Sequence, residues 1–140
     1  MEVAFLDTSA LVKRYHKESG SEIIDEIFEK FVIAISELSI VELVSALNRK
    51  LAESMISGDD LRIALSKFYE DLSDFLILKF DSQVVNMAVE AVLKYSLKTL
   101  DSLQIAFALK LKEYNPLFVS FDKKLAKVAE IEGFRVLDVQ

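Results

Sequence analysis

Val3-Ala4-Phe5-Leu6-Asp7 opens the chain with a short apolar run that ends directly in a carboxylate. Leu117-Phe118-Val119-Ser120-Phe121-Asp122 repeats this arrangement near the other end. Short runs rich in β-branched and aromatic residues are typical of buried strands. Longer helical patterns alternate with such runs along the chain. The alternation predicts βαβ units, and therefore an α/β sandwich of three layers in which helices cover both faces of a central, mainly parallel sheet.

The other elements follow from the period of their apolar residues. We expect strands at residues 3–6, 32–35, 75–79, 117–120 and 135–137. We expect helices at residues 9–15, 20–31, 37–54, 61–72, 101–112 and 123–132, and another that Asp81 caps. The chain has only 3 Gly and 1 Pro and no repeat or linker, which predicts a single domain over residues 1–140. Strand order does not follow from this pattern.

The composition excludes several classes of site. Cysteine is absent and His16 is the only histidine, which rules out disulfide scaffolds, Cys-ligated zinc and multi-His metal sites. The mean hydropathy is +0.30, but the longest uncharged stretches are far shorter than the roughly 20 residues of a membrane span. The N-terminus lacks the pattern of a signal peptide. We therefore expect a cytoplasmic protein. The net charge of −6 argues against a simple electrostatic nucleic-acid binder.

Three aspartates stand at predicted strand or helix ends. Asp7 and Asp122 each follow a predicted strand, and either could simply cap the helix that comes next. Asp101 opens a helix that has no other charge as far as Leu109. A helix so apolar is largely buried, so a cap at Asp101 would lie near the interior.

Glu42 is harder to explain as an ordinary surface charge. It is the only charged residue from Leu38 to Asn48, in the middle of a predicted helix, where it cannot act as an N-cap. Burying an unpaired carboxylate costs several kcal/mol. Glu42 is therefore either exposed beside an apolar groove, paired with a distant Lys, or part of a site.

Together the four acids indicate a metal site. The carboxyl ends of parallel strands share one edge of a sheet, and ligands bind there. Asp7 and Asp122 should meet at that edge, and Asp101 and Glu42 can reach it. Four carboxylates could remain ionised together only around a cation, and an all-oxygen site favours Mg²⁺ or Mn²⁺. Such a site suits phosphodiester hydrolysis without a nucleophilic side chain.

The chain resembles the PIN-domain ribonucleases, and most closely the VapC-type toxins of toxin–antitoxin pairs. Four segments carry the resemblance, at residues 6–13, 41–47, 100–106 and 119–125. It implies a metal-dependent endoribonuclease that cleaves single-stranded RNA, with Asp7, Glu42, Asp101 and Asp122 as the catalytic, metal-binding acids. It also implies a homodimer and an antitoxin partner. Ser9 and Ser120 match hydroxyl positions expected to orient carboxylates or metal-bound water.

One position departs from the family, because Gln104 stands where many relatives have His. This departure leaves open whether that position has a role in proton transfer or substrate contact. Basic residues trail three of the acids, and we take Arg14, Arg49 and Lys123 as candidates for RNA binding. The alternative to an enzyme is a non-catalytic, oligomeric interaction module of the same fold, in which the acids are caps and surface charges.

Overall fold

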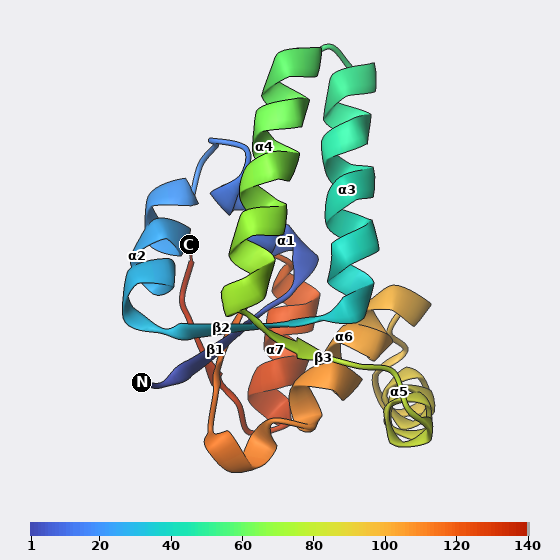
Figure 1. The fold of residues 1–140 in the computed structure, drawn as a ribbon. Coiled ribbons are helices and arrows are strands. Elements are labelled where there is room, and N and C mark those ends of the chain that lie inside the picture. Colours follow the sequence, from blue (N-terminus) through green and yellow to red (C-terminus); the bar gives the residue numbers. More distant parts are fainter. Residues whose placement is uncertain (140) are drawn as a thin grey trace.

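The computed structural model describes residues 1–139, so Gln140, the last residue of the predicted domain, lies outside the described part. Five parallel strands form one sheet in the order β3-β2-β1-β4-β5 (Figure 1). The strands are β1 (Val3–Leu6), β2 (Val32–Ser36), β3 (Leu76–Leu78), β4 (Leu117–Val119) and β5 (Arg135–Val136). The predicted α/β class and parallel sheet are confirmed.

Alternate side chains of the strands face two separate cores, as strand geometry requires. Phe5 and Phe118 point to one side, where they stack with their ring centroids 5.6 Å apart. Leu6, Ile35 and Val119 point to the other side. All five side chains are fully buried. The central strands are therefore apolar on both faces, which explains why they appear in the sequence as continuous apolar runs.

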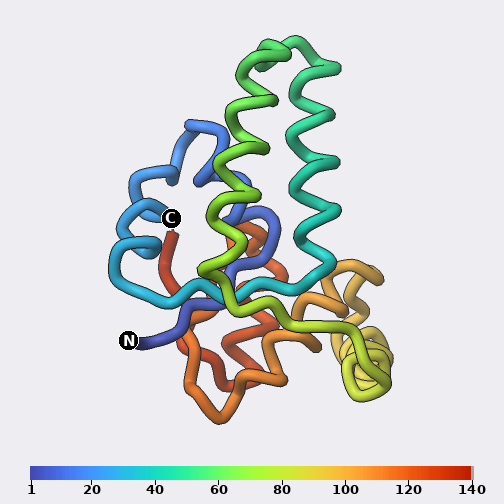
Figure 2. The backbone as a smooth tube through the Cα atoms, viewed as in Figure 1, coloured from blue at the N-terminus to red at the C-terminus, as the bar shows by residue number. Residues whose placement is uncertain are grey.

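Helices cover both faces and complete three layers (Figure 1). One face packs against α1 (Thr8–Leu11), α2 (Ser21–Lys30), α3 (Glu37–Ala52) and α4 (Gly58–Asp71). The other packs against α5 (Ser82–Tyr95), α6 (Thr99–Leu109) and α7 (Lys123–Ile131). Helices α3 and α4 form a hairpin that extends away from the sheet (Figure 2). No helix within residues 1–139 is long and apolar enough to cross a bilayer.

Several predicted helix boundaries were wrong. The helix expected at residues 9–15 is a single turn, α1, followed by a 3₁₀ turn at Val12–Arg14, because the amide of Tyr15 bonds back only three residues to Val12. Helix α4 starts at Gly58, since Ser57 and Asp60 form a capping box there.

The start of α6 also differs from the expectation. This helix begins at Thr99 and follows Lys98 as its N-cap residue, so Asp101 is the third helical residue and does not cap. The amide of Ser102 bonds to the carbonyl of Lys98, which extends the helix upstream of Asp101. After Leu109 the chain tightens into a 3₁₀ turn at Lys112–Tyr114, so the helix ends before residue 112.

Candidate functional site

The strand order places a crevice beside β1. The chain proceeds from β1 to β2 and β3 in one direction, then returns to the other side of β1 with β4 and β5. In such sheets the crevice lies at the carboxyl ends of the two strands where the direction reverses, here β1 and β4. Asp7 directly follows β1, and Asp122 follows β4 by three residues. The topology therefore brings these two acids to the place where α/β proteins bind ligands.

Asp7 is buried and serves two purposes. Its Oδ1 accepts hydrogen bonds from the Ala10 amide at 3.0 Å, which caps α1, and from Ser9 Oγ at 2.7 Å. Its Oδ2 accepts a short hydrogen bond from Ser120 Oγ. Burial, with a smaller contribution from Asp122, raises the pKa of Asp7 to about 6, although the bonds from Ser120, Ser9 and Ala10 oppose the rise. Capping and membership of the acid group are therefore compatible for this residue.

Asp122 and Asp101 approach the same crevice from two helices. Asp122 is the N-cap of α7 and accepts from the Leu125 amide at 3.0 Å. Asp101 lies in the first turn of α6, half-buried, and within residues 1–139 its carboxylate accepts no hydrogen bond. Burial raises the pKa of Asp101, Asp122 and Glu42 add to the rise, and Lys98 and Lys124 oppose it. The acids are thus close enough to disfavour one another's charge.

Glu42 is neither fully exposed nor paired with a lysine, which were the two simple explanations of this residue. It is half-buried, and its Oε1 accepts from Thr8 Oγ1 at 2.8 Å and from Gln104 Nε2 at 2.9 Å. Gln104 itself is buried, donates to Ser39 Oγ at 2.9 Å and accepts from Ser36 Oγ at 3.2 Å. A neutral amide therefore fixes the Glu42 carboxylate at Oε1 and leaves Oε2 without a hydrogen bond from residues 1–139.

All four acids line one pocket of about 150 Å³, together with Thr8, Ser9 and Gln104. Within residues 1–139, no three acidic or imidazole groups already form a ligand shell for an ion. The chemistry of the pocket nevertheless fits a hard divalent cation. Its donors are carboxylate and hydroxyl oxygens, and neighbouring carboxylates add to the rise in the pKa values of Asp7 and Asp101 that burial mainly causes.

Sequence reasoning missed three polar residues that shape this pocket. Thr8 and Ser39 hydrogen-bond to each other at 3.0 Å, and Ser36 accepts from the Ser39 amide to cap α3. The position of each residue in the sequence could have indicated its role. Thr8 follows Asp7 directly, Ser39 precedes Glu42 by three residues and so lies on the same face of the helix, and Ser36 precedes an acidic first turn.

The three candidate RNA-binding residues lie on different elements of the fold. Lys123 is exposed and follows Asp122 at the start of α7. Arg49 is exposed near the outer end of α3. Arg14 bonds to Asp25 at 2.7 Å and lies over the Phe28 ring. None of the three lines the acid pocket, and their role in binding RNA stays a prediction.

Replacing Gln104 with Leu should weaken the binding of Mn²⁺ at the acid pocket by about 10- to 100-fold, the usual cost of losing a group that orients a ligand of a cation. Leu is similar in size but cannot donate to Glu42 or Ser39. Metal titration by calorimetry should show a matching loss of affinity. Gln104→Glu is a useful comparison, because it adds a fifth carboxylate and should be at least as harmful. Unchanged metal affinity in Gln104→Leu would show that Gln104 has no positioning role.

The raised pKa of Asp7 has a measurable effect on stability in the presence of EDTA. Because the folded protein holds this proton up to about pH 6, and a free Asp releases it near 3.8, the Asp7 contribution to stability is greatest below pH 4. It falls as pH rises from 4 to 6 and is constant above. The loss is on the order of 3 kcal/mol. Urea unfolding at pH 4, 5, 6 and 7.5 gives the free energy of unfolding of wild type and of Asp7→Asn. Between pH 4 and pH 6, wild type should lose stability relative to the variant. A constant difference would contradict the raised pKa.

The fold is found in known proteins. A family model of the PIN domain matches residues 4–131. Among solved structures, a toxin–antitoxin complex from Klebsiella pneumoniae has a TM-score of 0.68 and 16% identity, with 98% of each chain covered. VapBC2 from Rickettsia felis, bound to a promoter DNA fragment, has a TM-score of 0.65 and 18% identity, covering 96% of this chain and 97% of that one.

A third similar structure is DNA-bound VapBC from Salmonella typhimurium, with a TM-score of 0.64, 16% identity and both chains fully covered. At these identities the similarity establishes the fold. No curated protein sequence matches the chain significantly. The family match spans most of the chain, so this protein belongs to the PIN domain family. PIN domains are generally nucleases, which agrees with a crevice lined by carboxylates.

Proposed function

We propose that this protein is a metal-dependent endoribonuclease that hydrolyses phosphodiester bonds of single-stranded RNA, and that it is the toxin of a VapBC-type toxin–antitoxin pair. One observation carries the proposal. Four acids from four separate segments of a PIN-domain chain line one small pocket at the reversal point of the sheet. An interaction module has no need to hold four like charges together at this cost.

Asp7, Glu42, Asp101 and Asp122 would hold Mg²⁺ or Mn²⁺. Such a cation, when bound, supplies Lewis-acid stabilisation of the phosphate and a more acidic water. The side chains around the acids fix the positions of the carboxylates through hydrogen bonds. Ser9 and Ser120 fix both oxygens of Asp7, and Gln104 and Thr8 fix one oxygen of Glu42. Carboxylates that are already held in place by such bonds lose little conformational entropy when they bind a cation.

The toxin assignment rests on the similar structures, which are toxin–antitoxin or VapBC complexes. The structure offers a groove of about 690 Å³ that an antitoxin segment could occupy. It is lined by Ile56, Ile63 and Ala64 and by both basic and acidic residues. A neighbouring reading frame whose product binds this protein and inhibits RNA cleavage would supply the partner. An RNA substrate and such a partner would place the protein in the cytoplasm.

A second copy of the chain is proposed to pack on α5. Val85, Val89, Val92 and Leu93 form one stripe of this helix, and all are exposed, Leu93 by 80%. An apolar stripe of this kind normally faces a partner. Because both copies would present the same helix, the contact would be isologous. Analytical ultracentrifugation should give the mass of a dimer, and a monomer at micromolar concentration would refute this part of the proposal.

RNA cleavage with Mg²⁺, Mn²⁺ or EDTA tests the enzymatic proposal. Wild type should cleave single-stranded RNA with either metal and not in EDTA, and Asp101→Asn should be inactive with both. Asp59→Asn is the matched control, since the Asp59 side chain is 87% exposed and lies on α4. Activity that persists in EDTA, or in well-folded Asp101→Asn, would refute the assignment of the acids.

A further inference from the structure

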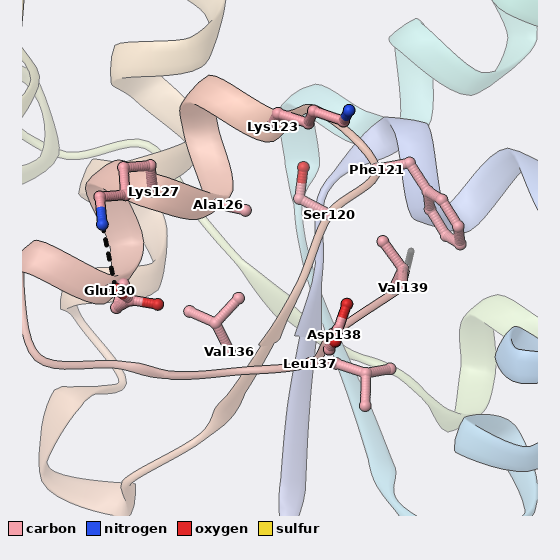
Figure 3. A pocket seen from close by; sticks show the side chains of 10 residues that line it. All are labelled: Ser120, Phe121, Lys123, Ala126, Lys127, Glu130, Val136, Leu137, Asp138 and Val139. Carbon is pink, nitrogen blue, oxygen red and sulfur yellow. Dashed lines mark hydrogen bonds and ion pairs between the residues drawn. The ribbon is translucent and has the colours of Figure 1, made fainter.

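A second pocket adjoins the acid pocket across one short segment of chain. It has a volume of about 350 Å³ and lies between α7, β5 and the residues that follow β5 (Figure 3). Ala126 lines it from α7, Val136 and Leu137 from β5 and the residue after it, and Phe121 from the segment after β4 (Figure 3). This volume is in the range of small-molecule sites.

The segment Ser120–Phe121–Asp122 belongs to both pockets. Ser120 Oγ donates to Asp7, and Asp122 lines the acid pocket, while Ser120 and Phe121 line the second pocket. Two residues of extended chain span at most about 7 Å, which is the scale of one nucleotide step. A phosphodiester held at the acids would therefore place a neighbouring nucleoside at the second pocket.

Phe121 is held firmly in this position. Its amide donates to Ser9 Oγ at 2.9 Å, and Ser9 also bonds to Asp7. Lys13 Nζ lies 4.5 Å from the centroid of its ring. Gly20 packs so closely that an added Cβ would lie 2.7 Å from the ring, and its φ of +96° also favours glycine. Phe121 is therefore a fixed aromatic side chain at the pocket, and aromatic side chains are common contacts of unstacked bases.

Charged groups of both signs line the pocket, with Glu130 and Asp138 beside two lysines, so a ligand that fits it has polar as well as apolar groups. Lys123 and Lys127 both line the pocket, and Lys127 Nζ lies 3.3 Å from Glu130 Oε1 (Figure 3). Lys123 stands next to Asp122, between the two pockets, so it can contact a phosphate that links them. The pocket thus combines an apolar interior with a cation at the side nearest the acids.

We propose that this pocket binds the base of the nucleotide next to the scissile phosphate and so sets the base preference of cleavage. The proposal rests on the proposed nuclease function, since it assigns the substrate subsite of the same centre. Base contacts with aromatic and apolar side chains tolerate all bases to some degree. The preference should therefore be graded, with one or two bases favoured at a single position beside the cleaved bond.

Ala126→Phe tests the pocket by filling it from α7, and Ala52→Phe is the matched control, because Ala52 is exposed at the end of α3. The substrates are short single-stranded RNAs that differ in one base on either side of the cleaved bond. Ala126→Phe should raise KM by about tenfold, leave kcat on the poorest substrate unchanged and flatten the base preference. The control should match wild type, and unfolding curves show whether both variants fold.

A binding measurement separates this proposal from the nuclease assignment. AMP, GMP, CMP and UMP are titrated in EDTA into ¹⁵N-labelled wild type and Ala126→Phe. At least one nucleotide should shift the amide signals of residues 126 and 136 in wild type and not in the variant. If these shifts occur but wild type does not cleave RNA, nucleotide binding at the pocket is supported and the nuclease proposal fails. Cleavage with unchanged KM and base preference in Ala126→Phe, and no shifts at these amides, would overturn the pocket alone.

Discussion

Replacing Asp7 with Asn is expected to lower the rate of RNA cleavage by about 1000-fold or more. Asp7 is the most buried of the four acids, and its two oxygens are fixed by Ser9 and Ser120. Removing its charge takes away an electrostatic contribution of several kcal/mol at the metal, and each 1.4 kcal/mol corresponds to a factor of ten. Single-turnover cleavage of a labelled RNA at saturating Mn²⁺ measures the effect.

The same variant should fold normally, which makes the loss interpretable. Asn is also a favourable N-cap, so the bond from the Ala10 amide can persist. Asn carries no charge to bury, so Asp7→Asn should unfold at the same or a higher temperature than wild type at pH 7.5 in EDTA. Cleavage within tenfold of wild type by a folded, nuclease-free preparation would remove Asp7 from the catalytic group.

Phe118→Ala is expected to cost about 3–5 kcal/mol of stability, the range for a large aromatic side chain removed from a core. Phe118 is fully buried in the central part of the sheet, stacks on Phe5 and also contacts Phe134 with centroids 5.6 Å apart. Loss of its ring leaves a cavity that the strands cannot close. Urea unfolding monitored by circular dichroism gives the change in free energy.

Tyr114→Ala is the control for this substitution, because Tyr114 is also aromatic but is 63% exposed. It should change the stability by no more than about 0.5 kcal/mol. Equal effects of the two substitutions would show that Phe118 is not part of the central core.

The sequence was sufficient to predict the central strands of the sheet because they are buried on both faces. Residues 3–6 and 117–119 are continuous apolar runs for that reason. Strand order was not accessible, since it depends on which strands pair across the chain. That order creates the crevice between β1 and β4. Helix ends were less accurate because local bonds decide them, as the extension of α6 upstream of Asp101 illustrates.

The four acids could be picked out because each is an isolated carboxylate beside apolar residues. The residues that hydrogen-bond around these acids could not be identified in the same way. Thr8 and Ser39 are ordinary polar residues in sequence, and only the packing of α1 against α3 brings them together. Gln104 stood out only as a departure from the family. The structure gives it a specific environment, as a buried donor to Glu42.

The net charge of −6 also has a different meaning in the structure. Four of the negative charges lie in one pocket, and a divalent cation there would reduce the formal charge to −4. Basic residues such as Lys123 stand beside that pocket. Acidity of the whole chain is therefore compatible with an RNA substrate, and binding should be modest, salt-sensitive and dependent on metal.

Anomalous diffraction from a crystal containing Mn²⁺ is the most direct test of the central claim, that the four acids form a divalent-metal centre. We expect an anomalous peak in the pocket within coordination distance of Asp7 and at least one of Glu42, Asp101 and Asp122, and no such peak in Asp101→Asn crystals prepared identically. A fully occupied Mn²⁺ site elsewhere on the protein, with the acid pocket empty at saturating Mn²⁺, would contradict it.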